Sequence, residues 1–246
     1  MTRLVHAELL KLRTTRLLLW LALMIVALIG LIVSLNGGER SFDDLARASS
    51  QRDLITTAAI SALIALILGI VVSTAEYAHG TIGGTFLVSP VRERVVAAKV
   101  FAAMLSGAVL AAFAWALALA LAAVWLAVRS VPSHLLSHDI FTLLLGLLAA
   151  SALTGAIGVG FGAILRRQTA AIVVALVWLL VGEPLMAVAG KQRYAPGHVV
   201  VAVAEAGHQA SGGDLLAFWP ALLLGLGYAA LFAVAGTLVV VRSDVT

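Results

Sequence analysis

Glu76 and His79 offer a carboxylate and an imidazole, which are common metal ligands. They stand three positions apart in the segment Glu-Tyr-Ala-His, and some helical bundles use such Glu-x-x-His pairs to hold two iron ions. A site of this kind also needs a second pair and further glutamates on facing helices. The long apolar runs of the chain carry a single glutamate, Glu183, so we expect no di-iron site.

Two further histidines, His134 and His138, stand one helical turn apart and are followed by Asp139. Two imidazoles and a carboxylate at this spacing could bind zinc. A fourth ligand at a defined position is missing, because His198 and His208 lie far along the chain. We therefore prefer to interpret these histidines as part of an interfacial loop, and we expect no metal on this chain.

Glu183 lies between two apolar stretches and is followed by Pro184. An ionisable residue at membrane depth costs on the order of several kcal/mol to bury. A residue retained at such a cost suggests a function. Two interpretations stay open: the apolar run ends near Gly182 and Glu183 faces the headgroups, or Glu183 lines a substrate path or a proton-linked site. The first is preferred.

Enzyme signatures are absent from the sequence. It has no G-x-x-x-x-G-K-[ST] loop for nucleotide phosphates, no H-E-x-x-H zinc motif and no G-x-S-x-G nucleophile elbow. It also has no cysteine. We therefore expect no catalytic residues and no cofactor on this chain.

The composition points to a membrane protein. Hydrophobic residues make up 62% of the 246 residues and charged residues 11%, whereas a soluble domain carries about 25% charged residues. One soluble core cannot bury this much apolar surface, so lipid is the natural solvent. Sixteen Lys and Arg residues are spread over the chain, which favours the positive-inside rule over nucleic-acid binding.

Six uncharged or nearly uncharged runs are long enough to cross a bilayer, which takes about 20 apolar residues. We therefore predict an all-α integral membrane protein with both termini on one side. The expected spans are residues 17–35, 54–75, 100–128, 140–165, 169–190 and 215–241. Residues 191–214 form the longest connection near the C-terminus, where we expect an outer loop with a short helix.

The distribution of basic residues orients these spans. With the N-terminus inside, ten Lys and Arg residues lie in the cytoplasm and six outside, so the rule favours N-in and C-in. Residues 1–16 precede the first span and place Val5, Leu9 and Leu12 at helical spacing. This pattern predicts an amphipathic helix in the inner interface.

Gly155, Gly158 and Gly162 share the fourth span at spacings of three and four. Small residues at such spacing let helices approach closely in lipid. The close approach could lie within the chain, which we prefer, or between two copies.

Residues 76–94 form the one sizeable cytoplasmic connection of this topology. Glu76 and Tyr77 stand where the second span leaves the membrane, and Gly80 and Thr81 could start a new turn. Phe86 and Leu87 form a short apolar patch ended by Pro90, and Arg92 and Arg94 anchor the next span. A small apolar knob facing the cytoplasm is a surface for another protein.

These residues resemble the signature of ABC-2-type transporter permeases, the membrane subunits of ABC exporters. The resemblance rests on Glu76, Gly80-Thr81, Phe86-Leu87, Pro90, Arg92, Arg94 and Lys99, and on the N-terminal stretch "HAELLKLRTTR". Gly83-Gly84 departs from the pattern, because two adjacent glycines weaken a helix by about 1 kcal/mol each relative to Ala.

The resemblance implies a single transmembrane domain over residues 1–246 that acts in a bacterial plasma membrane. It implies two separate ABC ATPase subunits, which carry ATP and Mg, and a second copy of this permease or a similar one. Residues 76–94 would dock on the ATPase. Because few charges are available to line a pathway, we expect a hydrophobic or amphipathic substrate. The alternative from the sequence is a stand-alone secondary transporter or channel.

Overall fold

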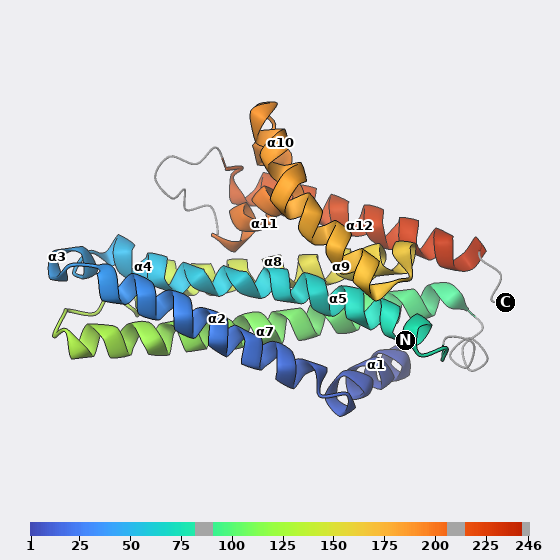
Figure 1. The fold of residues 1–246 in the computed structure, drawn as a ribbon, viewed down its shortest axis with the longest axis horizontal. Helices are drawn as coiled ribbons and strands as arrows, with labels where there is room; N and C mark the ends of the chain where they lie inside the picture. Colours follow the sequence, from blue (N-terminus) through green and yellow to red (C-terminus); the bar gives the residue numbers. More distant parts are fainter. Residues whose placement is uncertain (82–90, 206–214, 243–246) are drawn as a thin grey trace.

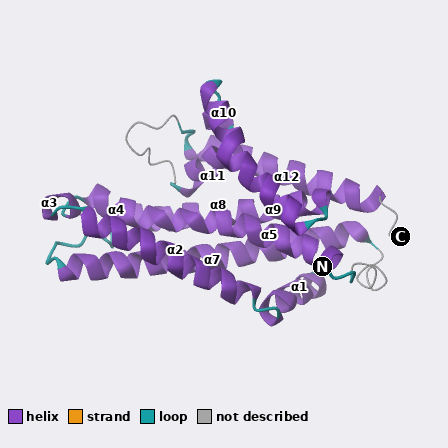
Figure 2. Cartoon of the chain, viewed as in Figure 1, coloured by secondary structure: helices purple, strands orange, loops and turns teal. Residues whose placement is uncertain are grey.

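The fold is that of a computed structural model, which describes residues 1–81, 91–205 and 215–242. All regular structure in these ranges is helical, with no strand among them (Figure 2). Within the same ranges, six helices are long and apolar enough to cross a membrane. The predicted all-α fold with six spans is confirmed.

The six spans follow one another along the chain. They are α2 (Leu17–Glu39), the joined helices α4 (Ala48–Thr56), η1 (Thr57–Ala59) and α5 (Ile60–Ala78), then α7 (Arg92–Val128), α8 (His138–Leu165), the joined helices α9 (Gln168–Val177), η2 (Trp178–Gly182) and α10 (Glu183–Val188), and α12 (Phe218–Arg242). Shorter helices join or precede them: α1 (Thr2–Thr14), α3 (Phe42–Leu45), η3 (Gln192–Tyr194) and α11 (Pro196–Ala204).

Helix α8 forms the centre of the bundle and packs against α5, α7, α11 and α12. Its serine Ser151 meets Ser61 of α5 at 3.1 Å, and both side chains are fully buried. The bilayer offers no water to these two hydroxyl groups, so they form a hydrogen bond with each other across the two spans.

The N-terminus and the last turn of α12 lie at one end of the molecule, together with α1, the last turn of α5 and the first turn of α7 (Figure 1). We call this the termini end. Helices α3 and α4 lie at the opposite end, where Gln51 is fully buried. The Gln51 amide donates to the carbonyls of Leu45 and Pro132 and accepts from the backbone of His134, which joins two connections.

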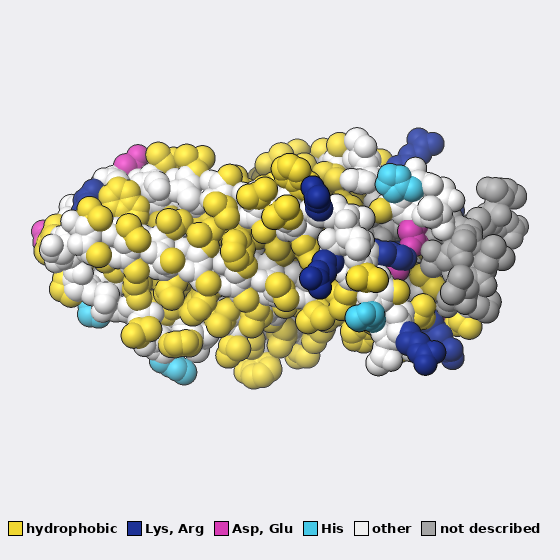
Figure 3. Space-filling model, turned by 90° about the horizontal axis from the view of Figure 1, so that it is seen from below, with side chains coloured by type: hydrophobic (Ala, Val, Ile, Leu, Met, Phe, Trp, Pro, Cys, Tyr) yellow, Lys and Arg dark blue, Asp and Glu magenta, His cyan; other side chains and the backbone are white. Residues whose placement is uncertain are grey.

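On the face seen in Figure 3, hydrophobic side chains cover much of the surface, and most of the visible Lys and Arg side chains lie in one half. The joined helices α9, η2 and α10 form the least enclosed span. Only 11% of their most apolar stretch is buried, against 56% for α8. They lean away from the main bundle (Figure 1). The space between them and the bundle is a cavity that is described below.

Two spans are longer than their apolar runs. Helix α7 begins at Arg92 and not near residue 100, and the second span begins at Ala48 and not at residue 54. The added turns contain charged residues, which are accommodated at the ends of the bundle where they find partners or solvent.

Candidate functional site: a buried charge cluster at the termini end

Helix α5 ends in a geometry that fixes the position of Glu76. Gly80 has a positive φ of 66°, the Thr81 N–H donates to the Glu76 carbonyl at 3.0 Å, and the Gly80 N–H points at the Tyr77 carbonyl. This is the Schellman arrangement, which favours glycine because a Cβ disfavours the left-handed backbone. Gly80 and Thr81 therefore terminate α5, and the turn that we expect them to start lies in the residues that follow, outside the described part of the chain.

The Glu76 side chain points into a cluster of four charges. The ammonium of Lys11 lies 2.6 Å from Glu76 and 2.7 Å from Glu8. The ammonium of Lys99 lies 3.0 Å from Glu8 and 3.2 Å from Glu76. We call these four residues the charge cluster, and it joins α1, α5 and α7.

Three members of the charge cluster are buried. The side chains of Glu8, Glu76 and Lys99 are 8%, 9% and 6% exposed, whereas Lys11 is 47% exposed. Two carboxylates face two ammonium groups, so the cluster carries no net charge. Buried charges are costly unless each has a partner, and this arrangement supplies one for every member.

Lys11 stays charged throughout the ordinary pH range. Burial by itself lowers the pKa of Lys11, but the hydrogen bonds to Glu76 and Glu8 and their negative charges raise it above its usual 10.5. Because the pKa of Lys11 rises on folding, the stability that its charge contributes is fully present below pH 10.5. It is lost only as the pH rises through the pKa of Lys11 in the folded protein. The link from α1 to α5 is therefore intact at neutral pH.

A second set of contacts holds the end of α12 at the same place. Arg92 donates to the Val240 carbonyl at 3.0 Å, and Arg166 donates to the Val239 carbonyl at 2.8 Å. The Arg166 guanidinium also lies 5.8 Å from the ring of Tyr77. The last carbonyls of a helix lack intrahelical partners and attract cations, so these arginines tie α7 and α8 to α12.

The predicted docking residues thus fall into two groups. The first group lies at the termini end and consists of Glu76, Tyr77, Gly80, Thr81, Arg92 and the exposed Arg94. The rest lie outside the described residues: Phe86, Leu87 and Pro90, together with Gly83-Gly84.

Sequence reasoning missed three members of the charge cluster as site residues. Glu8 and Lys11 fall within the predicted interfacial helix, and Lys99 appears only among the residues of the family resemblance. The available signal was the Glu-x-x-Lys spacing of Glu8 and Lys11 together with Lys99 inside an apolar stretch. In the structure Leu12 and Glu8 share the buried side of α1, so this side carries a carboxylate and is not purely apolar.

The glycines of α8 lie against neighbouring helices of the same chain. A Cβ at Gly155 would lie 2.8 Å from the Ala103 carbonyl oxygen of α7, and one at Gly162 would lie 2.9 Å from that of Ile70 in α5. A Cβ at Gly158 would collide with the Leu66 carbonyl of α5. Bare backbone at these positions lets three spans approach closely.

Glu183 is buried and has partners. Its carboxylate accepts from the Gly197 N–H and lies 3.0 Å from Nδ1 of His198, both in the first turn of α11. A carboxylate at a helix N-terminus satisfies free N–H groups and opposes the positive end of the helix dipole. The side chain therefore joins α10 to α11, and its closeness to the outer headgroups stays a prediction.

The remaining histidines form no cluster of metal ligands among the described residues, where no group of three or more His, Asp or Glu side chains could hold an ion. The backbone N–H of His134 donates to Gln51, which places this segment in the packing of the α3–α4 end.

Six apolar spans with a network of paired charges at one end define a multi-pass helical membrane protein. A family model described as ABC-2 family transporter protein matches residues 4–182, and the chain belongs to this family. The chain is thus an ABC-2-type permease, a membrane subunit that is not itself catalytic. No curated protein matches it.

Proposed function

We propose that the chain is the permease subunit of an ATP-driven exporter that moves a hydrophobic or amphipathic substrate across a bacterial plasma membrane. The family supports a transport role. The sequence has no phosphate-binding loop of its own, which supports our proposal that a separate ATPase carries ATP and Mg. Two ATPase subunits and a second permease, identical or similar, complete the proposed complex, which sits in lipid and binds no nucleic acid.

The charge cluster is the observation that carries the coupling part of this proposal. Residues 76–94 begin at Glu76, which contacts Lys11 and Lys99, and end beside Arg92, which contacts the end of α12. A partner that pulls or pushes on this segment would act on α5 and α7 at their fixed ends. We therefore assign residues 76–94 to ATPase docking.

Helix α1 would move together with the docking segment. Its Glu8 and Lys11 both contact cluster members on other helices, and α1 leads into the first span α2. Displacement of Glu76 and Lys99 would therefore displace α1 as well, because separating buried opposite charges costs more than moving them as a unit. The N-terminal helix acts in this proposal as a positioning element, on the cytoplasmic side with both termini.

Co-purification tests the docking assignment. The chain is expressed with a P-loop ATPase encoded beside its gene and purified through a tag on the permease. Replacement of Thr85–Val88 by Asp and Gly residues should abolish recovery of the ATPase, while the same kind of replacement at the exposed residues 47–49 of the opposite end should leave it unchanged. Equal recovery with both variants would contradict the assignment, and transport by the chain alone would favour a stand-alone transporter.

A further inference from the structure

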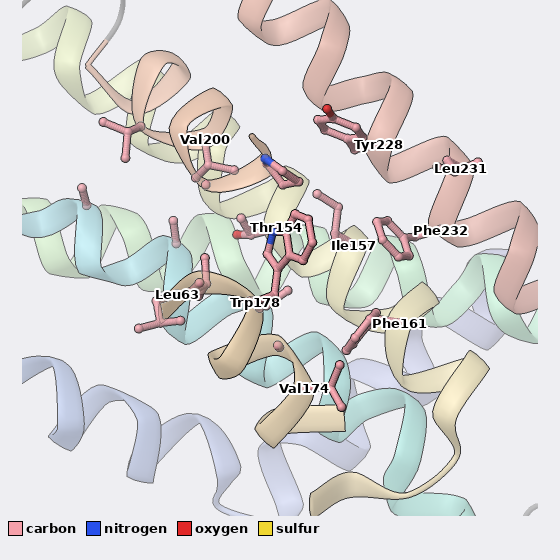
Figure 4. Close-up of a pocket in the computed structure, with 18 residues that line it drawn as sticks. Leu63, Thr154, Ile157, Phe161, Val174, Trp178, Val200, Tyr228, Leu231 and Phe232 are labelled. Carbon is pink, nitrogen blue, oxygen red and sulfur yellow. The ribbon is translucent and has the colours of Figure 1, made fainter. Parts of the chain in front are cut away.

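A cavity of about 440 Å³ lies between the main bundle and the leaning span formed by α9, η2 and α10. Helices α5, α8, α11 and α12 supply the other walls. Figure 4 shows Trp178 and Thr154 near the centre of the lining, with Phe161 and Phe232 on one side and Val200 on another. The volume lies in the range of about 300–1,000 Å³ that is typical of sites for small organic molecules.

The cavity wall is apolar and rich in rings. Among the described residues that line it, none is charged, and Trp178, Phe161, Phe232 and Tyr228 supply aromatic surface. The hydroxyl of Thr154 donates to the Ala150 carbonyl at 3.0 Å, and that of Tyr228 donates to the Tyr194 carbonyl at 2.6 Å. Both protons are therefore engaged within the protein.

The fifth span is irregular where it lines the cavity. Pro184 has no N–H and its ring crowds the carbonyl four residues earlier, and the helix widens to a π-turn over Trp178–Gly182. Single π-turns occur frequently at functional sites. This one places Trp178 and Leu179 on the cavity.

Glu183 closes the same wall. It follows the π-turn directly, and its carboxylate holds Gly197 and His198 at the start of α11. Gly197 lines the cavity, and a Cβ there would collide with the Glu183 carboxylate. The wide turn, the buried carboxylate and the glycine thus fix two cavity walls against each other.

We propose that this cavity is a binding site for a neutral, lipophilic molecule with an aromatic or compact aliphatic body, taken from the bilayer. A charged ligand would lose its hydration and find no partner on the wall. An anionic phospholipid is disfavoured as well, because anionic headgroups are held by basic pockets and no basic residue lines this one. Binding in this cavity does not depend on the proposed function. The further step, that the bound molecule is the transported substrate, rests on it.

Photolabelling tests the site without any ATPase. The full chain in phosphatidylcholine nanodiscs is irradiated with a neutral trifluoromethyl phenyl diazirine, and labelled residues are mapped by mass spectrometry. We expect saturable labelling of Trp178, Phe161 or Phe232 that excess non-photoreactive analogue removes. Labelling of these residues that no competitor reduces would overturn the proposal, as would equal labelling by a photoreactive phosphatidylcholine.

A matched pair of variants locates the site. Ala175→Phe adds a ring to the cavity lining, whereas Ala116→Phe adds the same ring to an exposed position of α7. We expect A175F to lose the saturable labelling and A116F to retain it; retention in A175F would overturn the proposal. Competition on the unchanged chain decides the question even where A175F does not fold.

A second measurement separates this inference from the proposed function. In the purified complex with the ATPase, the diazirine analogue should stimulate ATP hydrolysis with the wild-type chain and with A116F, but not with A175F. Failure of the ATPase to associate contradicts the proposed function and leaves the labelling result standing. An intact complex without saturable labelling overturns the site alone.

Discussion

Lys99 has the least exposed side chain in the charge cluster. Its ammonium contacts both Glu8 and Glu76 and is almost entirely buried. Replacement of Lys99 by Met leaves two carboxylates with only Lys11, so we expect a loss of about 3–5 kcal/mol in the free energy of unfolding. The measurement is thermal and denaturant unfolding of the purified chain in detergent.

Lys11 provides the internal comparison for Lys99. It contacts the same two carboxylates but is 47% exposed, and solvent screens its interactions. K11M should therefore cost less than K99M, and K191M, at an exposed position, should cost almost nothing. Equal effects of K11M and K99M would contradict the importance of burial in the cluster.

Glu183 allows a separate test at the residue scale. Glu183→Ala removes the acceptor for the Gly197 N–H, and an unsatisfied buried donor costs about 1–3 kcal/mol. Glu183→Gln retains an acceptor and should lose less. Unfolding in detergent measures both, with the exposed Glu39→Ala as control; equal losses for the Ala and Gln variants would argue against the capping role.

At the scale of elements, the glycines of α8 make the helix spacing testable. Gly158→Ala places a methyl group against the Leu66 backbone, which cannot move as a side chain can. Overpacking of this kind costs about 1–3 kcal/mol. Gly30→Ala in α2 meets nothing within 4 Å and should be neutral or slightly stabilising, so unfolding midpoints that fall equally for both variants would contradict this packing.

The number of spans could be predicted because apolar runs of membrane length carry their own signal. The start of α7 could not be predicted, because its added turns contain Arg92 and Lys99, whose partners are Val240 and Glu76 on other helices. The start of the second span could not be predicted either, because its added residues include Gln51, which donates to the distant Pro132 carbonyl. The chain separates such partners by up to 148 positions. The π-turn had a local cause in Pro184, but its effect on the cavity depends on α11.

The candidate site was predicted in the same uneven way. Glu76 and Gly80 carry a local signal, a carboxylate and a glycine where an apolar run ends. The pairing of Glu8 with Lys99 spans 91 positions and joins helices whose packing no local pattern specifies. Residues that act through such distant partners therefore became visible only in the folded chain.

At the scale of the whole molecule, the proposed orientation can be tested in intact cells. The sequence has no cysteine, so a single introduced thiol is a unique label. Leu136→Cys, at an 83% exposed position near the α3–α4 end, should react with a membrane-impermeant maleimide, and Ala78→Cys at the termini end should react only after the cells are opened. The reverse pattern would invert the topology.

The most direct test of the account joins these thiols to the proposed motor. A benzophenone maleimide is attached to Ala78→Cys or to Leu136→Cys in the chain co-expressed with its ATPase, and cross-linked products are identified by mass spectrometry after irradiation. The account predicts a cross-link to the ATPase from residue 78 and none from residue 136. A complex that assembles but cross-links from residue 136, or from neither, would contradict docking at residues 76–94.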